Sequence, residues 1–490
     1  MAGTRLMLLL SMLVPLLLLI APFAYRLTLV PRAPLPLNAI AALDVAALDT
    51  ALSSKLSNSQ YLTLWSSSPT TFDVLSSVQK HSALFSIGAN ENLDAALLNL
   101  VQKEGLQDTF VVFLLCTTNE IAPVTLGIHR HGWTEACSLT KQVQEEIYQI
   151  ISSMKNVPSI RTTLKYRWSF TFMNELPGME NNYVWENQMK LQALEYIEPL
   201  VDLLTPLAKF TVESEMVHYA ALAKTYHYDD ESKEYYVTAD DLQQFKSAND
   251  YATVSLLDDR EQLIHFMAAL PSSSHSPLVV RTKSKSKESS QSFIIPGYGG
   301  IAILDPSSEP REQIHKMMEV AVAQLRHFLG LHSKPISTSS ITQLPAKYSG
   351  MALWERDILA RFWLEKHWHS TLSALTSIGK LVNDMPQIIV LPRIQTQVNK
   401  AIKLIENTTS AIDTPSSLSA LNTLSMLKDL REAVDVIESA YYDSTMVAQL
   451  YFPEEHIYAV YLPLILPLVL PFGFGLVREV KRYKKKQASK

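Results

Sequence analysis

Cysteine is nearly absent from this chain, which contains only two cysteines in 490 residues. Two thiols cannot build a disulfide framework, so the small disulfide-stapled domains are excluded as a class. Cys116 and Cys137 could form one bridge in an oxidising compartment or remain two buried thiols. The sequence favours neither state, and Cys116–Cys137 is kept as a candidate disulfide.

An excess of positive charge is also missing. The formal net charge is −5, with 43 lysines and arginines against 48 aspartates and glutamates. Proteins that bind nucleic acid usually carry a basic patch or stripe that neutralises phosphates. We therefore expect no nucleic-acid partner.

The motifs that mark common active sites are absent as well. The chain has no G-x-S-x-G, no P-loop, no G-x-G-x-x-G and no H-E-x-x-H. The strongest catalytic candidate is Ile128–Gly132 (IHRHG) between Cys116 and Cys137, because a Cys/His pair can act as nucleophile and base. In caspase-type and legumain-type enzymes, however, the cysteine lies on a later strand, some tens of residues after the histidine. Cys137 follows His131 by only six residues, and Cys116 precedes it, so we assign no catalytic residue.

Three other clusters of residues suggest metal-binding or phosphate-binding sites, but a structural role explains each of them better. His227–Glu231 has no second ligand cluster at useful spacing, so a solvated loop is expected rather than a metal site. His367 and His369 lie two residues apart on a predicted helix and must face apart. Pro296–Gly300 is glycine-rich, but no helix follows that could bind phosphate, so it predicts a tight turn. We expect no metal and no cofactor.

The chain does have two long apolar runs, and the second one sets the orientation. Residues 457–477 carry no charge and are about long enough for a ~30 Å hydrocarbon core. Glu454 and Glu455 precede the run, and the basic tail 478–490 follows it. By the positive-inside rule this tail belongs in the cytosol. We therefore predict a transmembrane helix over 457–477.

Prolines recur inside this predicted span. Pro463, Pro467 and Pro471 are four residues apart and fall on one helical face. Each removes the hydrogen bond to the carbonyl four residues earlier, which lipid cannot replace. Gly473 and Gly475 would allow close helix approach. Either the helix packs against other membrane helices through this face, or the prolines reflect only their general abundance in membrane helices.

The first apolar run, residues 6–25, has two readings. A cleavable signal peptide fits the charge and apolar pattern, but cleavage after Ala24 would place Pro22 where a small residue is needed. The run also has the length of a full span, which favours a retained transmembrane helix. With two spans, residues 1–5 are cytosolic together with the C-terminal tail.

The region between the spans is then luminal. Asn407-Thr408-Thr409 is a glycosylation sequon in this region and agrees with the orientation, with Asn407 as the candidate site.

Residues 26–350 alternate buried strands and amphipathic helices, which predicts an α/β domain with helices packed on a mixed sheet. The run FVVFLLC (Phe110–Cys116) is typical of a strand covered on both faces. Expected strands are Tyr61–Trp65, Phe110–Cys116, Val124–Ile128, Leu164–Met173, Ile264–Leu270, Leu278–Lys283, Phe293–Ile295 and Gly300–Leu304; expected helices are Leu37–Leu56, Phe72–Lys80, Asn92–Lys103, Thr140–Lys155, Trp185–Leu207 and Pro310–Leu331.

Residues 351–445 have a different character. Between Met351 and Ser444 the only glycine is Gly379, and strand signals are scarce. The composition of residues 351–445 predicts a helical segment. Its apolar stripes either pack on the α/β domain or on one another, or they bind a partner subunit. Expected helices are Ala352–Leu381, Pro392–Asn407 with Ile394, Val398, Ile402 and Ile405 on one face, and a third with Leu418, Leu421, Leu424, Leu427, Leu430, Val434 and Ile437 in its stripe.

Short stretches along most of the chain carry a recognisable pattern: Arg32–Pro36, Phe210–Ser214, His218–Ala220, His275–Leu278, Gly297–Gly300, Met318–Val320, Gln324–Arg326, Trp354-Glu355, Leu450–Pro453 and Tyr461–Leu464. In these stretches the chain resembles the PIG-S family, a subunit of the glycosylphosphatidylinositol (GPI) transamidase. Two features depart from the family pattern: the loop Arg281–Ser290, and the tail KKKQASK, which lacks lysines at the dilysine retrieval positions. Retention in the endoplasmic reticulum would then depend on assembly.

The resemblance implies a two-span protein of the endoplasmic reticulum membrane with a large luminal domain. It implies a non-catalytic subunit of the complex that removes a C-terminal signal from a precursor protein and joins the new carboxyl end to GPI. The catalytic cysteine and histidine belong to the PIG-K subunit, and the other implied partners are PIG-T, PIG-U, a multispanning luminal peptidase-like subunit and membrane lipid. Contact with GPI or the precursor stays open. The alternative is a membrane-anchored luminal hydrolase or glycan transferase with an unrecognised site, although an α/β fold alone does not imply activity.

Overall fold

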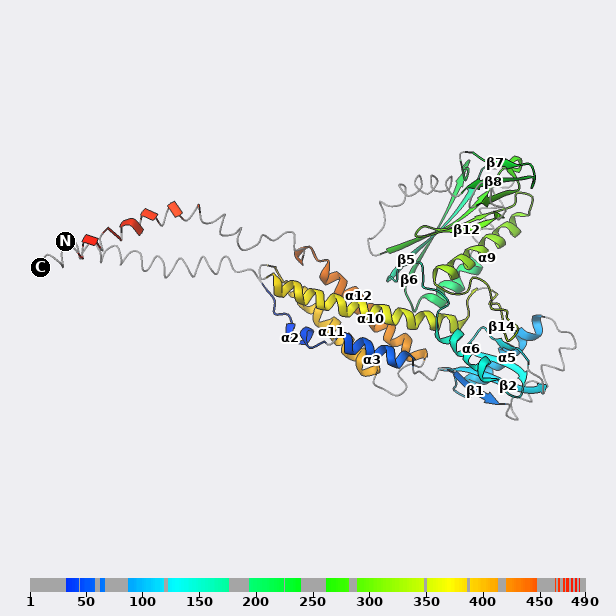
Figure 1. Ribbon diagram of the computed structural model, residues 1–490, viewed down its shortest axis with the longest axis horizontal. Coiled ribbons are helices and arrows are strands. Elements are labelled where there is room, and N and C mark those ends of the chain that lie inside the picture. The colour runs from blue at the N-terminus through cyan, green and yellow to red at the C-terminus, as the bar shows by residue number, and fades with distance from the viewer. Residues whose placement is uncertain are drawn as a thin grey trace. The chain divides into compact units, whose positions relative to one another are not determined.

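The structure is a computed structural model (Figure 1). It describes residues 32–43, 45–57, 62–66, 87–118, 122–175, 194–223, 225–238, 261–281, 289–347, 350–385, 388–412 and 420–446, and scattered positions between 463 and 484. By the density of its contacts the chain divides into two compact units. The larger unit comprises residues 46–370 and 404–432, and the smaller unit comprises residues 1–45, 371–403 and 433–490.

The first sheet of the larger unit is built around the buried strand β2. Its five strands follow the order β1-β2-β4-β3-β14, and β2 runs parallel to both of its neighbours. Val111 and Phe113 face the core beneath α5, whereas Phe110 and Val112 face the core beneath α6. This burial on both faces confirms what the run Phe110–Cys116 predicts. The bounds are β1 (Leu62–Ser66), α5 (Ile87–Lys103), β2 (Phe110–Thr118), β3 (Val124–Leu126), β4 (His131–Ala136), α6 (Lys141–Ser152) and β14 (Ile341–Gln343).

The second sheet also has five strands, in the order β12-β13-β9-β5-β6. The strands from β13 to β6 are parallel, and β12 turns back as an antiparallel hairpin on β13. Helix α9 covers one face, and Gln324 Nε2 donates to the carbonyls of Phe293 (3.2 Å) and Ile301 (3.1 Å). The bounds are β5 (Lys165–Asn174), β6 (Lys209–His218), β9 (Glu261–Leu270), β12 (Ser292–Ile295), β13 (Gly299–Ile303) and α9 (Pro310–Phe328).

A smaller sheet of four strands, in the order β11-β10-β8-β7, shares a core with the second sheet. Met173, Met267 and Ile301 contribute to that core from the large sheet, and Val237 and Leu278 contribute from the small one. The large sheet is therefore covered by helix on one face and by sheet on the other. The bounds are β7 (His227–Asp229), β8 (Glu234–Thr238), β10 (Leu278–Arg281) and β11 (Ser289–Ser290).

The glycine-rich stretch Pro296–Gly300 forms the turn of the β12–β13 hairpin, as the sequence predicts. Gly297 has φ +75°, a left-handed conformation that glycine adopts without strain. A Cβ atom on Gly299 would lie 1.9 Å from the carbonyl oxygen of His265 on β9. These glycines therefore serve the hairpin and its close approach to β9, and they do not cradle a ligand.

Three long helices follow the sheets, close to where the sequence places them. The predicted stripe of α11 is confirmed, because Ile394, Val398, Ile402 and Ile405 are all buried. The stripe predicted for α12 is wrong at its start, where Leu421 is 54% exposed, and Leu418 lies outside the described residues. The bounds are α10 (Leu353–Asp384), α11 (Pro392–Ile412) and α12 (Ala420–Tyr441).

In the smaller unit, the segment after the first apolar run is tied to helical residues. Arg32 donates to the carbonyl of Val382 (2.7 Å), and the amide of Ala33 donates to the carbonyl of Val390 (2.8 Å). Ile40 of α2 (Leu37–Ala41) is buried, and a Cβ on Gly379 would lie 3.0 Å from it. The Arg32–Pro36 stretch is thus held by hydrogen bonds within the unit.

Some elements differ from the sequence-based expectation. One helix is expected over Leu37–Leu56, but the structure has α2 and α3 (Val45–Ser57), because a bond from the Leu43 amide to the Ile40 carbonyl closes the first helix early. The expected loop at His227–Glu231 begins with strand β7, whose Tyr228 packs on Tyr235 of β8. Strands β4 and β6 are not predicted. The sequence of β4 has no alternating or continuous apolar pattern, and in β6 the alternation of Phe210, Val212 and Met216 is interrupted by Ser214. The expected helix at 72–80 lies outside the described residues, and of the helix expected over 185–207 only residues 194–204 are seen as helix.

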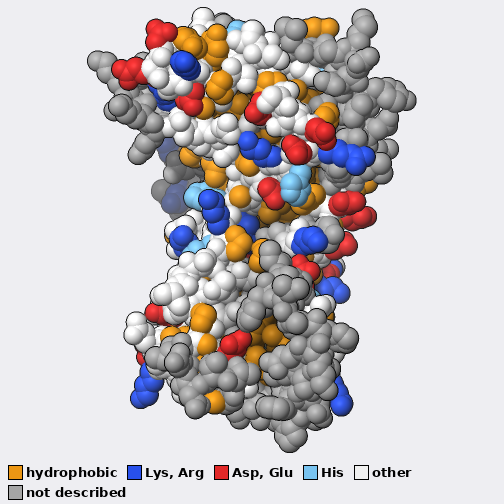
Figure 2. All heavy atoms as spheres, turned by 90° about the vertical axis from the view of Figure 1, so that its right-hand side faces the viewer, with side chains coloured by type: hydrophobic (Ala, Val, Ile, Leu, Met, Phe, Trp, Pro, Cys, Tyr) orange, Lys and Arg blue, Asp and Glu red, His pale blue; other side chains and the backbone are white. Residues whose placement is uncertain are grey.

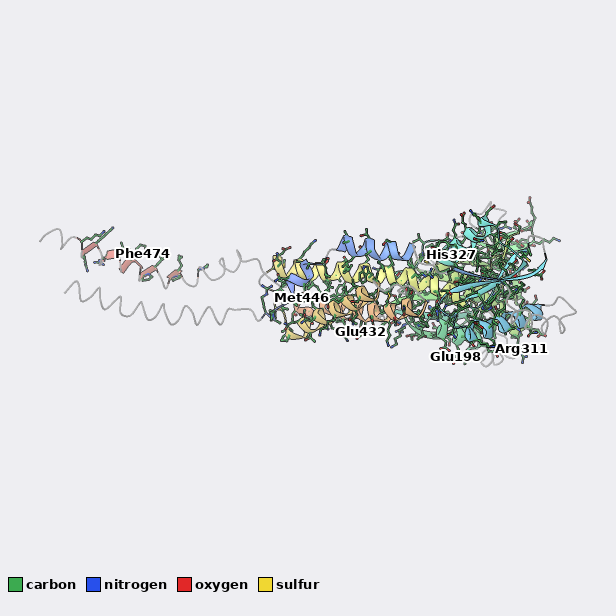
Figure 3. All side chains as sticks on the ribbon, turned by 90° about the horizontal axis from the view of Figure 1, so that it is seen from below. Glu198, Arg311, His327, Glu432, Met446 and Phe474 are labelled. Carbon is green, nitrogen blue, oxygen red and sulfur yellow. The ribbon has the colours of Figure 1, made fainter. Side chains whose placement is uncertain are left out.

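The two predicted spans are described only in small part. Residues 6–25 lie outside the described residues, and between 457 and 477 only scattered positions are described, all with helical backbone. Among the residues that the structure describes, no helix has both the length and the apolar character that a membrane crossing requires. In this single chain the side chains are exposed at Pro463, Pro467 and Pro471. Phe474, which is labelled in Figure 3, is exposed as well. Packing of this proline-bearing face against other membrane helices stays a prediction.

Candidate functional site

Of the two histidines in Ile128–Gly132, His129 precedes β4 by two residues, and His131 is the first residue of β4 and a core residue. Its side chain is fully buried, with its Nε2 atom 3.0 Å from Asp94 Oδ1 of α5. Its ring packs among Phe113 (6.4 Å between centroids), His129 (6.1 Å) and Trp133 (6.3 Å). A base that serves a substrate must be reachable by it, and His131 is enclosed.

The carboxylate of Asp94 has a structural role beside this histidine. Its Oδ1 accepts the amide hydrogen of Ile128 (3.2 Å), and a Cβ on Gly127 would lie 2.2 Å from the same oxygen. Burial lowers the pKa of His129, and the negative charge of Asp94 opposes that shift. The group therefore fastens α5 to the β3–β4 connection.

The two cysteines lie at the opposite end of the strands from His131. Cys137 directly follows β4, so it is about 20 Å from His131 along an extended strand, at ~3.3 Å per residue. On β2, Val111 pairs with His131 and Thr118 pairs with Ala136, so the backbone of Cys116 also lies toward the far end. Neither cysteine can pair with His131 as nucleophile and base, which agrees with the spacing argument. Cys137 is exposed, and the side chain of Cys116 lies outside the described residues, so the candidate disulfide stays a prediction.

The other histidine clusters are also structural. Asp229 accepts from Arg281 (2.7 Å), and this bond is the main cause that lowers the pKa of the carboxyl group. His367 is buried, which lowers its pKa to about 4, while His369 is exposed and lies 3.2 Å from Asp49. The two histidines of α10 face apart, as predicted. Within the described part of the chain, no group of three or more His, Cys, Asp or Glu side chains could hold a metal ion.

Two buried ion pairs stand out, and the search for sites in the sequence missed both. Arg130 contacts Asp357 of α10 through two bonds (2.5 and 3.0 Å), and Arg326 of α9 contacts Glu355 in the same way (2.7 and 2.9 Å). Removing one member of such a pair leaves an uncompensated buried charge. Arg326 and Glu355 both belong to stretches that carry the family resemblance, which is the signal that could have identified them.

Two clefts open on the larger unit. The larger, of about 990 Å³, lies between β12, α9 and residues of 333–347 and 350–352, and its lining includes Phe293, Val320, Ala323 and Pro345. The smaller, of about 470 Å³, lies between α6, the start of α10 and the segment 331–341. Neither lining contains a cysteine, so neither presents a Cys/His pair. On the face in Figure 2, side chains of both charge signs lie interspersed with hydrophobic ones.

The sequon residue Asn407 lies on α11 and is exposed. Thr408 is buried, and the hydroxyl of Thr409 donates to the carbonyl of Ile405 (2.9 Å). The asparagine side chain is therefore accessible on the folded helix, while its glycosylation stays a prediction.

Comparison with known proteins identifies the family. A family model described as "Phosphatidylinositol-glycan biosynthesis class S protein" (PIG-S) matches residues 11–486. The chain is 25% identical to the "GPI-anchor transamidase component PIGS" of Bos taurus, over 67% of this chain and 59% of that protein. It is 26% identical to the Mus musculus protein of the same name, over 68% and 60%. It is 24% identical to the "GPI transamidase component PIG-S homolog" of Schizosaccharomyces pombe, over 61% and 50%.

The matched region thus spans about three fifths of the length of these mammalian relatives. The family model, by contrast, covers nearly the whole of this chain. The resemblance drawn from short stretches of the sequence is confirmed, and the chain belongs to the PIG-S family.

Proposed function

We propose that this chain is a non-catalytic subunit of a GPI transamidase, the complex that attaches preassembled GPI anchors to the C-terminus of precursor proteins. The observation that carries the proposal is the family match over residues 11–486, together with relatives named as transamidase components. The proposed partners are the catalytic subunit PIG-K, PIG-T, PIG-U, the multispanning peptidase-like subunit, and membrane lipid.

The geometry of the histidine and cysteine residues supports the non-catalytic part of the proposal. His131 is buried in the core, and Cys137 follows the far end of the same strand. A chain with this arrangement can support a complex whose nucleophile and base come from another subunit. We further propose a location in the endoplasmic reticulum membrane, with spans at 6–25 and 457–477, cytosolic termini and the sheets in the lumen, on the charge pattern of the sequence.

A complementation experiment tests this function. In cells that lack their own PIG-S subunit, the chain is expected to restore surface display of a GPI-anchored reporter. Cys116→Ser, Cys137→Ser, His129→Asn and His131→Asn, each made singly, are expected to retain display once it is normalised to the amount of protein. The reason is that none of them takes part in chemistry. His131→Asn is expected to lower the amount of protein, because it alters a buried packed ring.

Two results would contradict the proposal. One is failure of the unaltered chain to restore display although it is made and inserted. The other is a single substitution at these four positions that abolishes display while the protein is present at the unaltered level, which would indicate an enzyme.

A further inference from the structure

Strand β6 is the outermost strand of the second sheet. It pairs with β5 over ten residues, from Lys209 opposite Lys165 to His218 opposite Asn174. The sheet order ends at β6, and among the described residues no strand pairs with its outer side (Figure 1). A ten-residue edge is long for a natural sheet, whose edges are usually short or blocked.

The hydrogen bonds to β5 define which backbone groups of β6 face outward. The amide of Lys209 donates to the carbonyl of Leu164 (2.9 Å), so Lys209 and every second residue after it bond to β5. The intervening residues direct both their N–H and their C=O groups away from β5. Among the described residues, no hydrogen bond reaches these outward backbone groups, which belong to Phe210, Val212, Ser214, Met216 and His218.

The side chains beside this edge alternate in character. Phe210 and Met216 are half-buried and Val212 is 38% exposed, and these three share one face of the sheet. Glu213 and Glu215 are exposed on the opposite face. Glu213 Oε1 accepts from Arg167 Nη1 (2.6 Å), which leaves Glu215 as the acid nearest the edge without an ion pair in the described part of the chain. The edge thus favours a strand that is apolar on one face and basic on the other.

Two devices that natural proteins use to block an edge, proline and lysine within the strand, are missing here. The strand KFTVESEMVH has no proline and a single lysine, Lys209, at its first position. A second copy of this chain is a poor occupant in the register centred on Ser214, and the two exposed glutamates of β6, against its single lysine, favour a basic partner instead. In a twofold antiparallel pair centred on Ser214, Glu213 of one copy would lie opposite Glu215 of the other, and like charges directly opposite are destabilising.

We propose that the outer edge of β6 receives an extended strand from another subunit of the transamidase, with basic and apolar residues alternating along it. Backbone hydrogen bonds to the five outward residues would supply affinity, and the acidic and apolar faces would supply selectivity. This inference rests on the proposed function, because it takes the occupant from the same complex.

The test uses the full chain, purified in mild detergent, with proline substitution at the edge. Ser214→Pro removes an outward amide and places a ring in the path of an added strand, yet it removes no bond to β5. We expect the variant to accumulate normally and to recover roughly tenfold less of the other subunits, since an added strand loses the hydrogen bond from the amide of residue 214 and meets the proline ring there. Ser214→Ala is the matched control and is expected to recover them at the unaltered level.

A second variant keeps the test decisive if Ser214→Pro fails to fold. Glu215→Lys leaves the backbone intact and opposes a basic strand, so recovery should fall, while Glu215→Gln should have a smaller effect. Hydrogen exchange gives an independent measurement: the amides of Val212, Ser214 and Met216 should exchange quickly in the isolated chain and slowly in the complex.

Several outcomes would overturn the proposal. These are unaltered recovery with a folded Ser214→Pro or with Glu215→Lys, outward amides that are already protected in the isolated chain, and self-association that Ser214→Pro abolishes. Failure of the unaltered chain to recover any subunit would instead count against the proposed function, so the two failures are distinguishable.

Discussion

Replacing Glu355 with alanine is expected to destabilise the chain by about 3–5 kcal/mol, the cost typical of breaking a buried ion pair. The side chains of Arg326 and Glu355 are only 5% and 2% exposed. Glu355 also accepts the amide hydrogen of Ala352 (2.8 Å), and Arg326 donates to the carbonyls of His332 and Gly350 (2.7 Å each). Loss of the carboxylate leaves a guanidinium charge buried without its counter-ion, and the amide of Ala352 without an acceptor.

The measurement is denaturant unfolding of the full chain in detergent, followed by tryptophan fluorescence. Glu365→Ala is the matched control, because Glu365 is an exposed glutamate on the same helix and should shift the midpoint very little. A Glu355→Ala midpoint equal to that of the control would show that this ion pair does not hold α10 to α9.

Replacing Trp354 with alanine is expected to cost a similar amount, about 3–5 kcal/mol. The indole is 2% exposed and packs edge-on against Phe110 of β2, with 6.5 Å between ring centroids. Its Nε1 atom donates to the carbonyl of Gly127 (3.1 Å). The substitution opens a cavity in the core beneath α6 and leaves that carbonyl without this donor.

Trp354→Phe separates the two contributions. It keeps much of the packed volume and loses the hydrogen bond, so its cost should be smaller, about 1–3 kcal/mol. Both variants are measured by circular dichroism during denaturant unfolding, since removing a tryptophan alters the fluorescence signal. Equal stabilities for Trp354→Ala and the unaltered chain would mean that α10 does not pack on the first sheet through this ring.

The sequence predicts those elements whose apolar residues follow a clear period. The continuously apolar run Phe110–Cys116 predicts strand β2, and the recurrence of Ile394, Val398, Ile402 and Ile405 on one helical face predicts α11. The sequence KFTVESEMVH does not predict β6, because it mixes charged and apolar residues, as an edge strand can when much of its surface is exposed. The stripe predicted for α12 is wrong at its start. The periodicity of apolar residues does not show where along a helix its apolar face stops being covered, and Leu421 is exposed.

The candidate sites, too, can be predicted only as far as residues close together in the sequence define them. The spacing of His131 and Cys137 was enough to reject a catalytic pair, because residues so close along one strand cannot meet. The pair of Arg130 and Asp357 could not be predicted, because the two residues are 227 positions apart and only the fold brings them together. The open edge of β6 follows from the order of strands in the sheet, which the sequence alone did not define.

Co-purification shows whether this chain acts as one subunit of a GPI transamidase. The tagged full chain is isolated from microsomes in a mild detergent that keeps other membrane complexes intact, and its companions are quantified by mass spectrometry. We expect recovery of the catalytic subunit and the other transamidase subunits in amounts comparable to the chain itself. Recovery of the chain alone under those conditions would contradict it.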